Sequence, residues 1–163
     1  MSATALVQVR PLADADRAWA AELIAGRWGS LRMVTRGVLH DMTRLPGLVA
    51  WRAGERVGLL TCCLAGDSCE IVSLDSLVEG AGIGSALVAA AQDTARAAGC
   101  RRLWLITTND NLPALRFYQK RGFRLVAVHV GAVDEARRLK PEIPAVGLDG
   151  IALHDELELE LAL

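Results

Sequence analysis

A change of hydrophobic period around residues 79–87, Glu-Gly-Ala-Gly-Ile-Gly-Ser-Ala-Leu, most constrains the fold of this chain. Upstream of it, three runs bounded by turn residues have the character of β-strands. These runs are residues 48–53, 56–64 and 68–77. Downstream, apolar residues recur at helical spacing, at Leu87, Ala91 and Ala95, until Gly99 offers a helix C-cap. The sequence therefore predicts an antiparallel meander that enters a helix through a tight glycine turn.

The rest of the chain adds strands and helices on both sides of this unit. Further strands are expected at residues 6–10, 101–107, 123–130 and 155–161. A helix is expected before Gly26, another between Asn111 and Gly122, and short helix and loop over residues 28–44. The order β-α-β-β-β-α-β-α-β-(α)-β predicts a mixed α/β sheet. With 163 residues, no repeat and no linker, residues 1–163 are expected to form a single domain.

Composition excludes several classes of function. The net charge of −1 gives no support for nucleic-acid binding, which needs a basic face. No apolar run approaches the ~18 residues of a membrane span, and the N-terminus has no signal-peptide pattern, so a cytoplasmic protein is expected. The four cysteines, Cys62, Cys63, Cys69 and Cys100, lack metal-ligand spacing and are expected to be reduced, mostly buried and free of metal.

The glycine turn has the character of an anion site. Backbone N–H groups at the start of a helix lack intrahelical partners, and glycines let the main chain close around a diphosphate. A P-loop is excluded because no Lys follows Gly84 or Ser85. A dinucleotide fingerprint is approached by Gly80, Gly82 and Ser85, but a meander precedes the turn and too little chain follows for the second half of such a sheet.

Two stretches together resemble the GNAT N-acetyltransferases. Residues 79–87 are similar to that family's acetyl-CoA motif, [QR]-x-x-G-x-[GA], and residues 111–123 to its second signature, N-x-x-A-x-x-x-Y-x-x-x-G-F. The resemblance implies the GNAT fold, a mixed and mostly antiparallel sheet with flanking helices and splayed central strands. It also implies acetyl transfer from acetyl-CoA to an amine by direct attack in a ternary complex, and a homodimer is common in such families. One departure is Glu79, where the family has Gln or Arg.

The resemblance also implies residue roles. Pantetheine would enter the gap between the splayed strands and pair with the backbone near Leu74 and Ser76, with Asn111 and Ala114 close to it. Tyr118, the chain's only tyrosine, would protonate the leaving thiolate. The pyrophosphate would lie on the amides of Gly80, Ala81, Gly82, Ile83, Gly84 and Ser85.

The residues leave the proton acceptor and the acceptor substrate open. Glu70, or less favourably Asp75, could take the amine proton directly or through water. Glu156, Glu158 and Glu160 share one face of the last strand, either as a solvated edge or as an acidic wall that attracts a cationic amine. The acceptor is expected to be a small-molecule or peptide amine. A CoA-binding module of the same fold without turnover, acting as a sensor or scaffold, is the alternative function.

Overall fold

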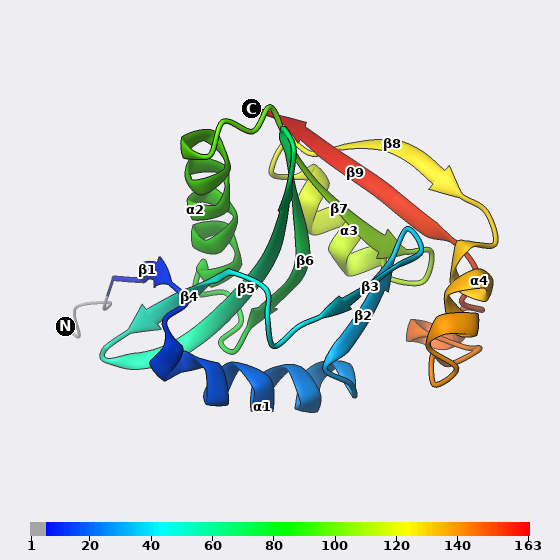
Figure 1. Cartoon of the computed structure of the whole chain (residues 1–163), viewed down its shortest axis with the longest axis horizontal. Coiled ribbons are helices and arrows are strands. Elements are labelled where there is room, and N and C mark those ends of the chain that lie inside the picture. Colours follow the sequence, from blue (N-terminus) through cyan, green and yellow to red (C-terminus); the bar gives the residue numbers. More distant parts are fainter. Residues whose placement is uncertain (1–5) are drawn as a thin grey trace.

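Seven strands form one sheet in the order β1-β4-β5-β6-β7-β9-β8, and β2 and β3 form a separate hairpin (Figure 1). The computed structural model describes residues 6–163. The strands are β1 (Gln8–Pro11), β2 (Arg32–Thr35), β3 (Val38–Asp41), β4 (Gly47–Arg52), β5 (Glu55–Ala65), β6 (Ser68–Ser76), β7 (Arg102–Thr108), β8 (Arg124–His129) and β9 (Glu156–Ala162). The helices are α1 (Arg17–Trp28), α2 (Ile83–Ala97), α3 (Leu112–Gln119) and α4 (Ala132–Leu139). This confirms the predicted mixed, mostly antiparallel fold.

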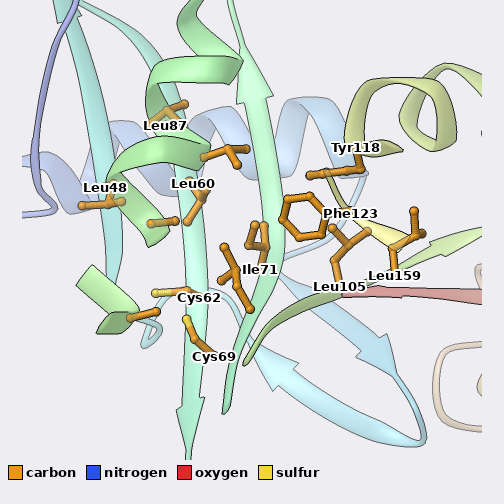
Figure 2. Close-up of a cluster of buried hydrophobic side chains, with 14 of the residues drawn as sticks. Leu48, Leu60, Cys62, Cys69, Ile71, Leu87, Leu105, Tyr118, Phe123 and Leu159 are labelled. Atoms are coloured by element: carbon orange, nitrogen blue, oxygen red, sulfur yellow. The ribbon is translucent and has the colours of Figure 1, made fainter. Parts of the chain in front are cut away.

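Helices α1 and α2 cover opposite faces of the sheet. On the α2 side, the predicted inner residues Leu87, Ala91 and Ala95 are buried against the strands. Figure 2 shows this core continuing past β6 to Tyr118 and Phe123. On the other side, α1 packs on a smaller cluster that shares no residue with the first. Two separate apolar layers therefore fix the central strands from both faces, as expected of a sheet that is buried on both sides.

The two central strands β6 and β7 pair over only part of their length. Four parallel pairs run from Ser68 opposite Arg102 to Ile71 opposite Leu105. Beyond Ile71, β6 pairs only with β5 and β7 only with β9, so the strands diverge (Figure 1). At the same point the β5–β6 register shifts, because Cys62 faces Ile71 whereas Thr61 faces Ser73. Val72 is thus the extra residue of a β-bulge, and its backbone groups are released from the regular ladder.

The C-terminal strand β9 lies inside the sheet, which corrects the expectation of a solvated edge. It pairs antiparallel with β7 on one side and with β8 on the other. The expected row of carboxylates is also largely neutralised: Arg102 pairs with Glu158 and Glu160, and His129 lies 3.0 Å from Glu158. Of these three glutamates, only Glu156 forms no ion pair with any residue of 6–163, and its side chain is buried. The edge strands of this sheet are β1 and β8.

Residues 32–41 form a β-hairpin within the stretch 28–44, where short helix and loop were expected, so that expectation was wrong. Strands β2 and β3 pair from Arg32 opposite Asp41 to Thr35 opposite Val38. Between them, Arg36 and Gly37 have φ values of 48° and 74°, as a two-residue type I′ turn requires. Asn-Gly or Asp-Gly usually marks such a turn, and Arg-Gly is a weak signal.

None of the helices among residues 6–163 has the length and apolar content that a membrane crossing requires.

Candidate active site

The glycine turn between β6 and α2 leaves the start of the helix open. Gly80 and Gly82 have φ values of 68° and 72°, and Gly82 is the N-cap without a side-chain hydrogen bond. Gly84 lies so close to α3 that an added Cβ would be 2.9 Å from Cζ of Phe117. The glycines therefore serve two purposes: Gly80 and Gly82 make the turn, and Gly84 lets α2 approach α3. The N–H groups of the first helical turn remain available to an anion.

A guanidinium stands beside this helix start. Nε and Nη2 of Arg121 donate to Oγ of Ser85 at 3.0 and 2.6 Å. Its Nη1 donates to the carbonyl of Phe117, and the guanidinium lies 3.5 Å from the centroid of the Phe117 ring. Helix dipole, free amides and a fixed cation thus meet at the position expected to hold a pyrophosphate. Glu79 is exposed there and opposes them.

A narrow cleft of about 100 Å³ lies between the diverging strands. Four of the residues predicted from the sequence border it, whereas Ser76 does not: these four are Leu74, Asn111, Ala114 and Tyr118. Asn111 is the N-cap of α3, and its Oδ1 accepts from the amide of Ala114 at 3.1 Å. The cap holds α3 against the open side of the cleft.

A larger cavity of about 340 Å³ lies on the other side of the divergence, and we call it the large cavity. It shares Trp28, Val72, Ile106, Thr107 and Asn111 with the narrow cleft. Its remaining wall is mostly apolar and comes from β2, α4 and the segment after α4, with Thr108 of β7 and Glu156 of β9. The two spaces therefore meet at these shared residues, among them the bulged Val72.

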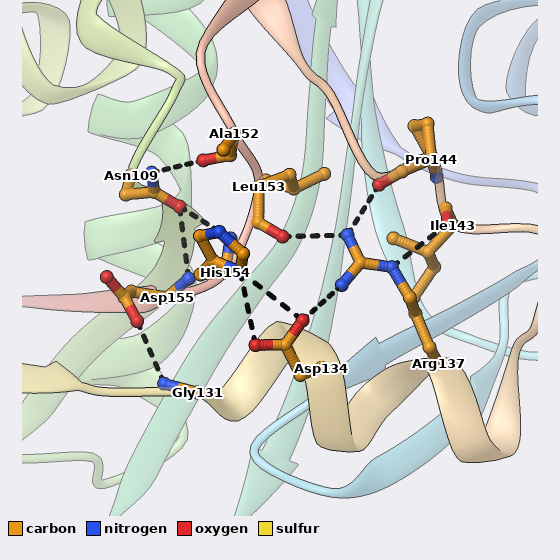
Figure 3. Close-up of polar contacts among 10 residues, drawn as sticks. All are labelled: Asn109, Gly131, Asp134, Arg137, Ile143, Pro144, Ala152, Leu153, His154 and Asp155. Atoms are coloured by element: carbon orange, nitrogen blue, oxygen red, sulfur yellow. Dashed lines mark hydrogen bonds and ion pairs between the residues drawn. The ribbon is translucent and has the colours of Figure 1, made fainter.

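A polar network fixes the wall of the large cavity after α4 (Figure 3). Arg137 of α4 donates to the carbonyls of Ile143, Pro144 and Leu153 at 3.2, 2.6 and 2.7 Å. Asp134 pairs with the same guanidinium and lies 3.2 Å from Nδ1 of His154. The three carbonyl-bearing residues all line the cavity. One arginine thus pre-organises a wall that contains no regular strand or long helix.

Tyr118 lies at the end of the narrow cleft within an aromatic cluster. Its ring makes edge contacts with Phe117 and Phe123, at centroid distances of 5.0 and 5.3 Å. Burial raises the pKa of the Tyr118 hydroxyl, and nearby Asp75 adds to the rise. The phenol therefore carries its proton at neutral pH and can act as a donor. Asp75 itself accepts from Nε1 of Trp28 at 3.0 Å and borders neither space.

Glu70, the predicted proton acceptor, lies behind the wall of the large cavity. Its Oε2 is 3.6 Å from Nε2 of His40, which is 2.9 Å from Oγ1 of the cavity residue Thr35. Its Oε1 is the one buried side-chain oxygen among residues 6–163 without a hydrogen-bond partner. Burial raises the pKa of Glu70. Glu70 can reach the cavity only through Thr35, so its catalytic role stays a prediction.

Glu156 is a second buried carboxylate, and it borders the large cavity itself. Its Oε2 accepts from the amide of Arg36 at 3.1 Å. Burial raises its pKa, which the Arg36 contact partly offsets. A buried carboxylate with a raised pKa at a cavity wall is suited to accept a proton near neutral pH. No group of three His, Cys, Asp or Glu within residues 6–163 is arranged to hold a metal ion.

Replacing Glu70 by Gln should raise stability at neutral pH. The pKa of Glu70 lies above its ordinary 4.5 in the folded protein, so the folded state binds more protons than the unfolded chain above pH 4.5. The free energy of unfolding of the parent therefore falls as pH rises through that window. We expect urea unfolding between pH 4 and 8 to show that the free energy of unfolding of Glu70→Gln increases relative to that of the parent as pH rises. The exposed Glu22→Gln should show no such increase. Parallel profiles for parent and Glu70→Gln would contradict this.

Comparison with known proteins identifies the family. The sequence model of the Acetyltransferase (GNAT) family matches residues 16–123, and the chain belongs to this family. The protein YdhI of Bacillus subtilis (strain 168) is 44% identical over 137 residues, covering 83% of this chain and 86% of YdhI. Among solved structures, the IAA acetyltransferase of Bacillus cereus ATCC 14579 has a TM-score of 0.77 at 22% identity, covering 97% of this chain and 100% of that one.

A Bacillus subtilis acetyltransferase in complex with CoA has a TM-score of 0.69 at 20% identity, covering 98% of this chain and 99% of that one. At these identities the structural likeness shows the fold, and it agrees with the mixed sheet described above.

Proposed function

We propose that the protein is an N-acetyltransferase that moves the acetyl group of acetyl-CoA to an amine in the large cavity, by direct attack in a ternary complex. The meeting of the narrow cleft and the large cavity at the Val72 bulge carries this proposal. Pantetheine passing Ser76 and then entering the cleft along Leu74 would bring the thioester to this point. A main-chain N–H released by the bulge is suited to polarise its carbonyl.

The CoA pyrophosphate would bind the amides of Gly80 to Ser85. The open helix start and the Arg121 guanidinium support this position. Asn111 and Ala114 border the cleft and would contact the pantetheine arm. The helix-start amides and Arg121 suit a diphosphate, and the cleft suits an uncharged chain, so together they fit an extended ligand that carries both.

In the proposed reaction the amine nitrogen attacks the thioester carbonyl carbon. A carboxylate takes a proton from the amine, and the carbon–sulfur bond breaks with its electron pair on sulfur. Tyr118 donates its proton to that sulfur, and exchange with solvent then restores both groups. Glu156 borders the cavity and is favoured as the proton acceptor, whereas Glu70 would need Thr35 as an intermediary.

The test is amine-dependent release of free thiol from acetyl-CoA, followed with DTNB across a panel of primary amines. Release that depends on both the amine and the protein, together with the acetylated amine by mass spectrometry, supports transfer. Acetyl-CoA binding by calorimetry without thiol release from any amine would instead indicate a CoA-binding module.

Ser85→Glu should weaken CoA binding about tenfold while the fold stays intact. Ser85 is exposed in the first turn of α2, where a carboxylate favours the helix dipole by ~0.3–1 kcal/mol. The same charge would repel the pyrophosphate and engage Arg121, at a cost of ~1.4 kcal/mol per tenfold loss. Isothermal titration with CoA and thermal melting measure the two effects, with Ser85→Gln as the uncharged control. Equal CoA affinity in both variants would show that the pyrophosphate does not bind at this turn.

A further inference from the structure

Lys140 is a buried ammonium that borders the large cavity. The chain has two lysines among its 18 basic residues: Lys120 is exposed, whereas Lys140 is 8% exposed. Its Nζ donates to the carbonyl of Arg32 at 2.9 Å, which uses one of three N–H groups. Within residues 6–163, no carboxylate oxygen lies within 4.0 Å of it. Burial lowers the pKa of Lys140, and the charge of Glu142 partly offsets this, so a negative charge favours its ammonium form. With a single hydrogen bond and no carboxylate in direct contact, the ammonium is suited to receive an anion.

The carboxylates of the same cavity have other partners. Glu142 lies 3.9 Å from Nη2 of Arg32, with about half of each side chain exposed. Glu156 accepts from the Arg36 amide. The cavity therefore presents a positive charge and a negative charge that are both available to a ligand, separated by apolar side chains such as Met33, Val34 and Val133. A zwitterionic molecule with an apolar body matches this distribution.

The length of strand β2 sets the separation between the Lys140 and Glu156 contacts. Nζ of Lys140 is bonded at Arg32 and the Glu156 carboxylate at Arg36, on either end of the extended segment. At ~3.3 Å per residue the two contact points are about 10 Å apart. A hydrogen bond of ~3 Å at one or both ends leaves about 4–7 Å between the ligand's amine and its anionic group. A cavity of about 340 Å³ also limits the ligand to a small molecule.

We propose that the acceptor is a small amino carboxylate, with its amine beside Glu156, its carboxylate on Lys140 and an apolar body of several bonds between them. This inference rests on the proposed acetyl transfer, because the amine end must face the thioester at Val72. A carboxylate is favoured over a phosphate dianion, because one ammonium balances a single negative charge and Glu142 and Glu156 already oppose a second. Lys140 is the specificity-determining residue on this account.

A matched pair of amines tests the proposal. 4-(Aminomethyl)benzoate and benzylamine share the apolar body and the amine, and differ only in the carboxylate. The parent should acetylate the benzoate with at least a tenfold higher kcat/KM, the scale of a hydrogen bond between charged groups. Lys140→Met should abolish that preference by lowering kcat/KM for the benzoate to the level of benzylamine, and the affinity for CoA should be kept. Lys140→Arg should retain part of the preference, and the exposed Lys120→Met should retain all of it.

Calorimetric binding of 4-(aminomethyl)benzoate to the CoA-loaded protein gives a readout that needs no turnover. If neither amine is acetylated, the proposed function fails, and binding still decides this inference. Lys140-dependent binding supports the inference. Absent binding, binding unaffected by Lys140→Met, or equal kcat/KM for the two amines in the parent overturns it. A Lys140→Met variant that loses both amines equally, while thermal melting shows it folded, assigns Lys140 to holding α4 on β2 and also overturns it.

Discussion

Replacing Tyr118 with Phe should lower kcat about 100-fold, the scale of a lost general acid. The hydroxyl is the one proton donor proposed for the departing thiolate, and burial raises its pKa so that it stays protonated at neutral pH. The ring itself is held by edge contacts with Phe117 and Phe123, which the substitution keeps. Single-turnover acetylation with saturating acetyl-CoA measures the chemical step without interference from product release.

Two controls separate this role from packing. CoA affinity by calorimetry should change by less than about threefold, and the melting temperature should stay close to that of the parent, because only one oxygen is removed. A folded Tyr118→Phe variant with the parent's single-turnover rate would leave Tyr118 as a member of the aromatic core alone.

Local sequence signals predicted the part of the fold around the glycine turn. Strand β6, the turn and helix α2 follow one another without interruption, so period, glycines and helix cap are all read within residues 68–99. The buried face of α2 at Leu87, Ala91 and Ala95 followed from helical spacing. Asn111 at the start of α3 was also recognisable, because a capping side chain acts on the amide three residues later.

Contacts between distant segments could not be predicted in the same way. The place of β9 between β7 and β8 depends on pairings across 27 or more residues, and alternation alone does not distinguish an edge strand from an inner one. From the sequence, the carboxylates of β9 were therefore expected to lack ion-pair partners, although Arg102 on β7 neutralises two of them. The hairpin β2–β3 was missed because Arg36-Gly37 is an uncommon turn pair.

The candidate site likewise has one part that local sequence predicts and one part that distant segments form. Its proposed CoA side consists of contiguous motifs, whereas the large cavity is assembled from β2, β7, α4, β9 and the segment after α4. Lys140 carried no sequence signal, since a single lysine before Pro141 resembles any surface residue. Its burial arises only when α4 packs against β2. The chemistry shared by a family is thus readable in motifs, and the substrate end of the site requires the tertiary structure.

Replacing Glu156 with Gln should lower kcat/KM for a working amine about 100-fold, because a lost general base costs ~10²–10⁴. Gln retains an oxygen for the Arg36 amide, so the fold and CoA affinity should stay unchanged. Glu160→Gln on the same face of β9, paired with Arg102 outside both spaces, is the matched control and should behave like the parent.

The pH profile distinguishes a base from a merely structural carboxylate. Burial raises the pKa of Glu156 above its ordinary 4.5, and a base must be ionised to act, so the parent's kcat/KM should fall as pH drops through that raised pKa. Glu156→Gln has no such group and should lack this acidic limb, leaving only the slope from ionisation of the amine. Glu70→Gln should keep the limb. If instead Glu70→Gln loses both rate and limb while Glu156→Gln keeps them, the proton travels through Thr35 to Glu70, and Glu156 only ties β9 to the β2–β3 turn.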